Sequence, residues 1–130
     1  MLRKTVTHEG GHPVILVDSI TKIEPQDDGA IIVSASHGGQ SSGEFALAVP
    51  LTAVFFNDAG IGKDEAGVSA LGMLDARGVA SCAISHESGR IGDAADMWEH
   101  GTISRVNDAA AKKGARVGAT VQEAVRILAK

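Results

Sequence analysis

The feature that most constrains the fold is a pair of short apolar runs separated by one helix-length segment. Residues 52–56 form a near-continuous run of β-branched and aromatic residues, which is typical of a strand buried on both faces. Residues 79–84 form a second such run. Between them, apolar or small residues at i, i+3, i+4 and i+7 from Gly67 follow helical spacing, and Gly78 ends the pattern. This order predicts a βαβ unit with two parallel strands.

Two more strands are expected nearer the N-terminus. Residues 13–20 and 30–37 are apolar runs, and residues 25–29 between them carry Pro and Asp-Gly turn chemistry. We therefore predict that these two strands form an antiparallel hairpin. Residues 38–43 are expected to form a loop of small residues, followed by a short strand at 46–49.

The C-terminal part is predicted to be helical. Residues 93–113 are expected to be mostly helix, split at Gly101, and Thr120 with Glu123 fits a capping box that opens a last helix. Together these patterns predict a single α/β domain over residues 1–130. Its mixed sheet would have an N-terminal antiparallel hairpin and a C-terminal βαβ unit followed by two helices.

Composition narrows the class of function. The net charge is −4, basic residues are scattered, and there are three Phe, one Trp and no Tyr, so we expect no nucleic-acid partner. No apolar run approaches the roughly 20 residues of a membrane span, and the polar start of the chain predicts no signal peptide. The lone Cys82 suits a reducing compartment, so we expect cytoplasmic localisation and a buried, unreactive thiol.

Polar residues follow the first buried strand of the βαβ unit, where ligands of parallel α/β sheets bind. Asn57 and Asp58 come directly after the strand, and Gly60 and Gly62 would let a ligand approach the backbone. Lys63 would add positive charge for a carboxylate or phosphate. The segment matches neither a Walker loop nor a dinucleotide fingerprint. The alternative is a turn whose polar residues only shape the chain.

A second polar segment follows the next strand of the unit. His86 stands just past the strand and is suited to proton transfer near neutral pH. Arg90 is suited to holding a carboxylate through two hydrogen bonds. Asp93 either orients a histidine or caps the following helix, and we favour the cap. Because carboxyl ends of parallel strands meet at one edge, this segment should lie beside Asp58.

A third candidate is His37, which lies between Ser36 and a Gly-Gly pair. Backbone N–H groups there are suited to an oxyanion hole, whereas Ser41 and Ser42 lack the elbow motif of a nucleophile. The alternative is that this glycine-rich loop only provides the geometry of a turn.

Four residues within fifteen positions are candidate metal ligands: His86, Asp93, Asp96 and His100. The i, i+4 spacing of the last two is more typical of surface electrostatics, and no His-Glu-x-x-His motif occurs. We therefore expect no metal and no cofactor.

Three short motifs carry a family resemblance. They are Asn57-Asp58-x-Gly60, Arg77-Gly78-Val79-Ala80, and the closing pattern from Gly114 to Ala124. On these motifs the second half of the chain resembles the YunC-like family, small bacterial α/β domains of unknown function. The resemblance implies a compact α/β fold and supplies no activity.

These patterns predict a small cytosolic enzyme or ligand-binding domain for an anionic small molecule. If it is catalytic, the residues suit acid–base chemistry of a hydrolase, lyase or isomerase. The expected catalytic residues are His86, His37 and Asp58, and the expected ligand-binding residues are Asn57, Gly60, Gly62, Lys63 and Arg90. The alternative is a non-catalytic assembly module or accessory subunit of a larger enzyme. Homo-oligomerisation is expected under both hypotheses.

Overall fold

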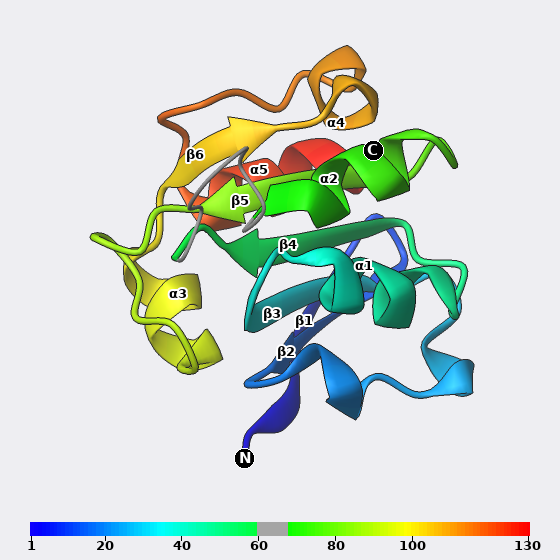
Figure 1. Cartoon of the computed structure of the whole chain (residues 1–130), viewed down its shortest axis with the longest axis horizontal. Helices are drawn as coiled ribbons and strands as arrows, with labels where there is room; N and C mark the ends of the chain where they lie inside the picture. The colour runs from blue at the N-terminus through cyan, green and yellow to red at the C-terminus, as the bar shows by residue number, and fades with distance from the viewer. Residues whose placement is uncertain (60–67) are drawn as a thin grey trace.

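Strands of the sheet lie side by side in the order in which they occur along the chain. The computed structural model describes residues 1–59 and 68–130, and these contain a six-stranded sheet of order β1-β2-β3-β4-β5-β6 (Figure 1). The strands are β1 (Arg3–Glu9), β2 (His12–Val17), β3 (Ile31–His37), β4 (Ala53–Asn57), β5 (Ala80–Ile84) and β6 (Ile103–Val106). Strands β2 to β5 are parallel, whereas β1 and β6 pair antiparallel at the two edges.

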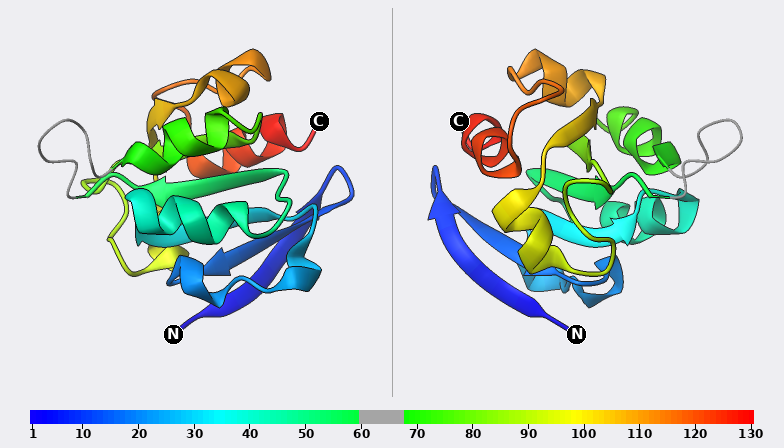
Figure 2. Two further views of the ribbon diagram at one scale, coloured as in Figure 1. Left: turned by 45° about the vertical axis from the view of Figure 1, so that its right-hand side comes forward. Right: turned by 90° about the vertical axis from the view of Figure 1, so that its left-hand side faces the viewer.

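Helices cover both faces of this sheet, as Figure 2 shows. On one face lie α1 (Gln40–Leu47) and α2 (Ser69–Asp75), and the other face is covered by α3 (Ala94–His100) and α5 (Val121–Leu128). The short helix α4 (Asp108–Lys112) packs near β5. None of the helices in the described residues is long and apolar enough to cross a bilayer.

Side-chain alternation in the central strands divides the core into two layers. Phe55 packs with the residues of α3 and α5, and its neighbour Phe56 packs with those of α1 and α2. Both rings are fully buried. Because successive side chains of a strand point to opposite faces, a strand covered on both sides must be apolar at every position. The apolar run of β4 meets this requirement.

The predicted fold class is confirmed. Strands β4 and β5 are parallel and joined through α2, which buries Ala70, Leu71 and Leu74. Thr120 caps α5 through the predicted capping box with Glu123. The expected start of the α2 helix, before Val68, lies outside the described residues.

The N-terminal hairpin exists, but different strands form it. Strands β1 and β2 pair antiparallel around Gly10 and Gly11, whose φ angles of 56° and 84° suit glycine. Residues 13–20 and 30–37 correspond to β2 and β3, and the prediction that they pair antiparallel is wrong because they are parallel neighbours. Strand β1 was missed because it is an edge strand without a fully buried residue, so its apolar signal is weak.

Two other predicted elements are corrected. Helix α1 takes up residues 40–43 of the expected loop at 38–43 and residues 46–47 of the expected strand at 46–49, and residues 48–49 are not in a strand either. The predicted helix at 93–113 is interrupted by β6, a short edge strand in which Ile103 alone is buried. Gly101 directly follows α3, at the point where the helix ends. The residue packs too closely for a side chain, because a Cβ there would lie 2.8 Å from side-chain atoms of both Ile84 and Val121.

An ion pair ties the edge strand β1 to the connection between β2 and β3. That connection contains two 3₁₀ turns, η1 (Ile20–Lys22) and η2 (Pro25–Asp27). The Arg3 guanidinium donates two hydrogen bonds of 2.8 Å to the buried Asp27 carboxylate. These bonds from Arg3 lower the pKa of Asp27 below its ordinary value of 3.8. The pair therefore holds both segments against each other at neutral pH.

Replacing Asp27 by Asn should lower the free energy of unfolding by about 1–3 kcal/mol, because a charged, bidentate pair is lost while Arg3 stays partly solvated. Urea unfolding at pH 7 measures this, with the exposed neighbour substitution Asp28→Asn as control. Since the folded pKa of Asp27 is lowered, its contribution is present above pH 3.8 and is lost as the pH falls through the folded value. A difference between wild type and Asp27→Asn that grew on acidification would contradict this account.

Candidate functional site

The connection from β5 to α3 crosses back over the carboxyl edge, the end of the sheet at which the parallel strands β2 to β5 finish. We call residues 85–93 the edge segment. In Figure 1 it leaves the tip of β5 and descends to α3 past the strand ends. Its first tie is to β4, where the Asn57 amide nitrogen donates to the Gly89 carbonyl oxygen at 2.9 Å.

Further along, the edge segment and the start of α3 are bound to the next two strands. The Gly92 N–H donates to the carbonyl of Ala35 on β3 at 3.0 Å. The Ala94 N–H donates to a carboxylate oxygen of Asp18, just past β2, at 3.0 Å. The chain from 85 to 94 is thus bonded in turn to three strand ends.

A distortion in β3 makes one of these bonds available. The register with β4 is regular up to Val33 and resumes only at His37, so three residues of β3 face one of β4. Such a bulge leaves backbone groups unpaired within the ladder and re-aims nearby side chains. Ala35 lies in the bulge, and its free carbonyl receives Gly92.

Asn57 is fully buried, and both the nitrogen and the oxygen of its side-chain amide form hydrogen bonds. In addition to Gly89, the nitrogen lies 3.7 Å from the sulfur of Met97 on α3. The amide oxygen accepts the Ala59 N–H at 2.9 Å. Asn57 therefore holds the edge segment in place, which is a larger structural role than the turn former weighed from sequence.

Asp58 and His86 form a hydrogen-bonded pair at the start of the edge segment. One carboxylate oxygen of Asp58 lies 2.6 Å from Nδ1 of His86 and also accepts the His86 backbone N–H at 2.9 Å. The Asp58 side chain is 8% exposed, whereas the His86 side chain is 53% exposed. The carboxylate is thus fixed inside the protein, while the ring it holds faces solvent. The predicted proximity of these two residues is confirmed.

Each partner changes the proton affinity of the other. Burial alone raises the pKa of Asp58, but hydrogen bonds from Ser104 and His86 outweigh it and leave that pKa below 3.8. The hydrogen bond to Asp58 raises the pKa of His86 above its ordinary value of 6.5. The pair is therefore a buried anion beside an imidazole that titrates above pH 6.5.

A hollow of about 370 Å³ lies beside this pair. His86 and Arg90 both line it, so the structure brings together two of the predicted site residues. The full lining consists of Ala59, His86, Glu87, Ser88, Gly89, Arg90, Ile91 and Asp96. Gly60, Gly62 and Lys63, which were also predicted for the site, lie outside the described residues.

His37 belongs to a neighbouring hollow of about 340 Å³. It is exposed at the end of β3 and does not line the hollow of His86. Ser42 donates to the backbone carbonyl of His37 at 2.7 Å, so this serine supports the start of α1. Of the three predicted catalytic residues, His86 and His37 therefore line two adjoining hollows, and the buried Asp58 contacts His86 without lining either one.

The acidic residues weighed as metal ligands have structural partners. Asp93 caps α3 by accepting the Asp96 N–H, as favoured from sequence. Asp96 accepts the Arg90 N–H at 2.9 Å and so closes the edge segment onto α3. Within residues 1–59 and 68–130, no group of three or more His, Cys, Asp or Glu side chains is placed to hold a metal ion.

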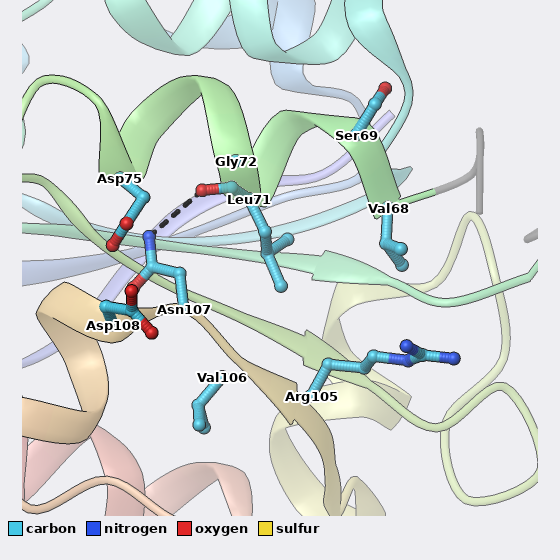
Figure 3. Close-up of a pocket in the computed structure, with 9 residues that line it drawn as sticks. All are labelled: Val68, Ser69, Leu71, Gly72, Asp75, Arg105, Val106, Asn107 and Asp108. Carbon is cyan, nitrogen blue, oxygen red and sulfur yellow. Dashed lines mark hydrogen bonds between the residues drawn. The ribbon is translucent and has the colours of Figure 1, made fainter. Parts of the chain in front are cut away.

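Another hollow, of about 410 Å³, lies between α2 and β6, and no histidine lines it (Figure 3). Asn107 at its floor donates to the Leu71 and Val79 carbonyls and accepts the N–H groups of Ser81 and Ala110. All four hydrogen bonds available to this amide are thus satisfied inside the protein. The lining lacks a proton-transfer pair, so we place the site at the smaller hollow of His86.

Sequence analysis missed two residues that support this site. Ser104 reaches Asp58 from β6, a strand hidden within the predicted helix at 93–113. Asp18 holds the start of α3 and also accepts the Leu2 N–H at 2.8 Å. Its position just after an apolar run was a usable signal, of the same kind as that of Asp58.

Cys82 is buried as expected, and burial raises the pKa of its thiol to about 12.

The Asp58–His86 pair predicts a titration that NMR can follow. The imidazole resonances of His86 should titrate with a midpoint above 6.5 in the wild type and lower in Asp58→Asn, which removes the negative partner. Because the folded pKa of His86 is raised, the pair stabilises the fold below pH 6.5, and this contribution is lost as the pH rises through the folded value. Glu87→Gln is the control and should lower the midpoint less, because Glu87 acts without a hydrogen bond. Equal shifts in both variants would contradict the pairing.

Asn57 should be required for the edge segment. Asn57→Ala leaves the Gly89 carbonyl and the Ala59 N–H without partners and should cost about 2–4 kcal/mol of unfolding free energy. Asn57→Asp keeps an acceptor for Ala59 but loses the donor to Gly89, so amide exchange should stay slow at Ala59 and become faster in the edge segment. Gln40→Ala, at an exposed amide, is the control. Unchanged exchange in the edge segment of both Asn57 variants would refute the tie.

No family model, curated protein or solved structure matches this chain. The resemblance to the YunC-like family, carried by short motifs, therefore stays a prediction.

Proposed function

We propose that this protein is a small acid–base enzyme that acts on a carboxylate-bearing small molecule. The observation that carries the proposal is the 2.6 Å contact between Asp58 and Nδ1 of His86, with the carboxylate buried and the ring exposed beside a hollow. The pair stands at the carboxyl ends of parallel strands, where α/β enzymes place their catalytic groups.

His86 is suited to move a proton in either direction. When neutral, a ring that donates through Nδ1 to Asp58 keeps its lone pair on Nε2, the nitrogen directed away from the carboxylate. The raised pKa of His86 increases the protonated fraction of the ring near neutral pH, so the ring is able to donate a proton as well as accept one. Asp58 stabilises the imidazolium that forms when Nε2 takes up a proton.

Charges around the hollow favour a carboxylate over a phosphate. Arg90 supplies a guanidinium that is able to bind a carboxylate through two parallel hydrogen bonds. Glu87 and Asp96 line the same hollow, and their negative charges would repel a dianion more than a monoanion. The proposed substrate is thus a small molecule with one free carboxylate, with or without an ester group. Arg90 binds the carboxylate, and the reacting atom lies near Nε2 of His86.

The groups present suit proton transfer next to the carboxylate. Three reaction types need only this: removal of a proton on the carbon beside a carbonyl, elimination of water, and activation of water for ester hydrolysis. In each, His86 takes a proton through Nε2 and returns one at the end of the cycle.

One NMR experiment in D₂O separates these reactions, with pyruvate, 3-hydroxybutyrate and monomethyl succinate as probes, each of which carries one carboxylate. Deuterium exchange into pyruvate reports proton abstraction, crotonate from 3-hydroxybutyrate reports elimination, and methanol from the ester reports hydrolysis. We expect one of these changes with the wild type, and its rate should fall at least about 100-fold in His86→Gln, since general acid–base groups contribute that much.

The matched control is His8→Gln, which removes an exposed histidine of β1 at the opposite end of the sheet. Its rate should equal that of the wild type. A reaction that survives His86→Gln would exclude His86 as the proton-transfer group. Stable self-association without turnover of any probe would favour the assembly role instead.

A further inference from the structure

We infer that the hollow beside His37 is a second subsite of the same site, which binds an apolar ring carried by the carboxylate substrate. This inference rests on the proposed function and names the class of substrate more closely. The subsite is the hollow of about 340 Å³, and its lining includes Asp18, Ile20, Ser36, Ser42, Phe45 and Ile91.

The two hollows adjoin each other at Ile91. This side chain belongs to the edge segment and lines both the hollow of His86 and the subsite. His37 pairs in register with Asn57, and Asn57 with Ile84, so the strand ends of the two hollows are two strand spacings apart, about 10 Å. A ligand with a short chain between carboxylate and ring spans this distance.

Apolar side chains at the mouth of the subsite are unusually exposed. Phe45 on α1 is 44% exposed and Ile91 is 45% exposed. Among the described residues, the other exposed large apolar side chains are Met1 and Val117. Two exposed large apolar side chains that line one hollow are typical of a surface that is covered when a ligand binds.

Several polar side chains of the subsite already form hydrogen bonds with other groups of the protein. Ser36 accepts the Ile20 N–H, and Ser42 donates to the His37 carbonyl. Both carboxylate oxygens of Asp18 accept backbone N–H groups. The remaining lining is dominated by apolar atoms of Ile20, Phe45 and their neighbours.

The negative charge of Asp18 in this hollow disfavours a second anionic group there. The two hollows therefore take chemically different parts of one ligand. The carboxylate lies at Arg90 and His86, and the ring lies between Phe45 and Ile91. The ligand class is an aryl-substituted short-chain monocarboxylate.

The test is an NMR titration of the whole chain with acetate, phenylacetate and 3-phenylpropionate, following backbone amides. Affinity should rise along this series, with 3-phenylpropionate binding roughly tenfold or more tightly than acetate because the ring is removed from water. All three should perturb residues 86–90, and the ring-bearing probes should also perturb Phe45 and Ile91.

Phe45→Ala should remove most of the preference for 3-phenylpropionate and leave the affinity for acetate unchanged. Because Phe45 is exposed, this variant should fold, and its melting temperature verifies that. Val117→Ala, at an exposed apolar residue outside both hollows, is the control and should keep the preference. Arg90→Gln should weaken all three probes together.

The outcomes separate the two claims. Equal affinity for acetate and 3-phenylpropionate, or a preference that survives Phe45→Ala, overturns the subsite, while acetate binding at residues 86–90 keeps the proposed function. If no carboxylate perturbs residues 86–90, the proposed function fails and the subsite inference fails with it.

Discussion

The carboxyl edge depends on one physical constraint, the attachment of residues 85–94 across the ends of three strands. In doubly wound sheets a reversal of strand order opens a crevice at this edge. Here strands β2 to β5 follow one another without reversal, so the connections alone open no such crevice. The edge segment supplies the missing walls, and the buried amide of Asn57 is its first anchor.

The same attachment sets the chemistry of the site. His86 donates both its backbone N–H and its ring Nδ1 to one oxygen of Asp58, so the path of the edge segment and the proton affinity of the ring depend on a single carboxylate. Asp58 stays ionised although it is buried, because hydrogen bonds replace its lost water. A shift of the edge segment would therefore alter the base strength of His86.

Elements with strong local patterns could be predicted from sequence, and elements made by tertiary pairing could not. Residues 52–56 and 79–84 are apolar at nearly every position, and both are strands. Edge strands β1 and β6 carry few buried side chains, so periodicity does not identify them. Strand partners were predicted from turn residues at 25–29, which instead form part of a crossover between parallel strands.

The candidate site was predictable to a similar extent. Asp58 and His86 follow adjacent parallel strands, which is why their proximity could be predicted. The burial of Asn57 depends on Gly89 and Met97, residues 32 and 40 positions away, and no local pattern encodes such contacts. His37 was predicted to share a site with His86, whereas the two residues line separate hollows. No sequence pattern indicates the bulge in β3 or the path of the edge segment between these hollows.

The central claim is that Asp58 fixes His86 as a base with its lone pair on Nε2. Long-range ¹H–¹⁵N correlation NMR of the wild type, recorded above the pKa of His86, measures which ring nitrogen carries the proton. The geometry predicts the tautomer protonated at Nδ1, because this nitrogen lies 2.6 Å from Asp58, whose ionised carboxylate only accepts hydrogen bonds. A dominant tautomer protonated at Nε2 would contradict the account, since the outward nitrogen would then have no lone pair to accept a proton.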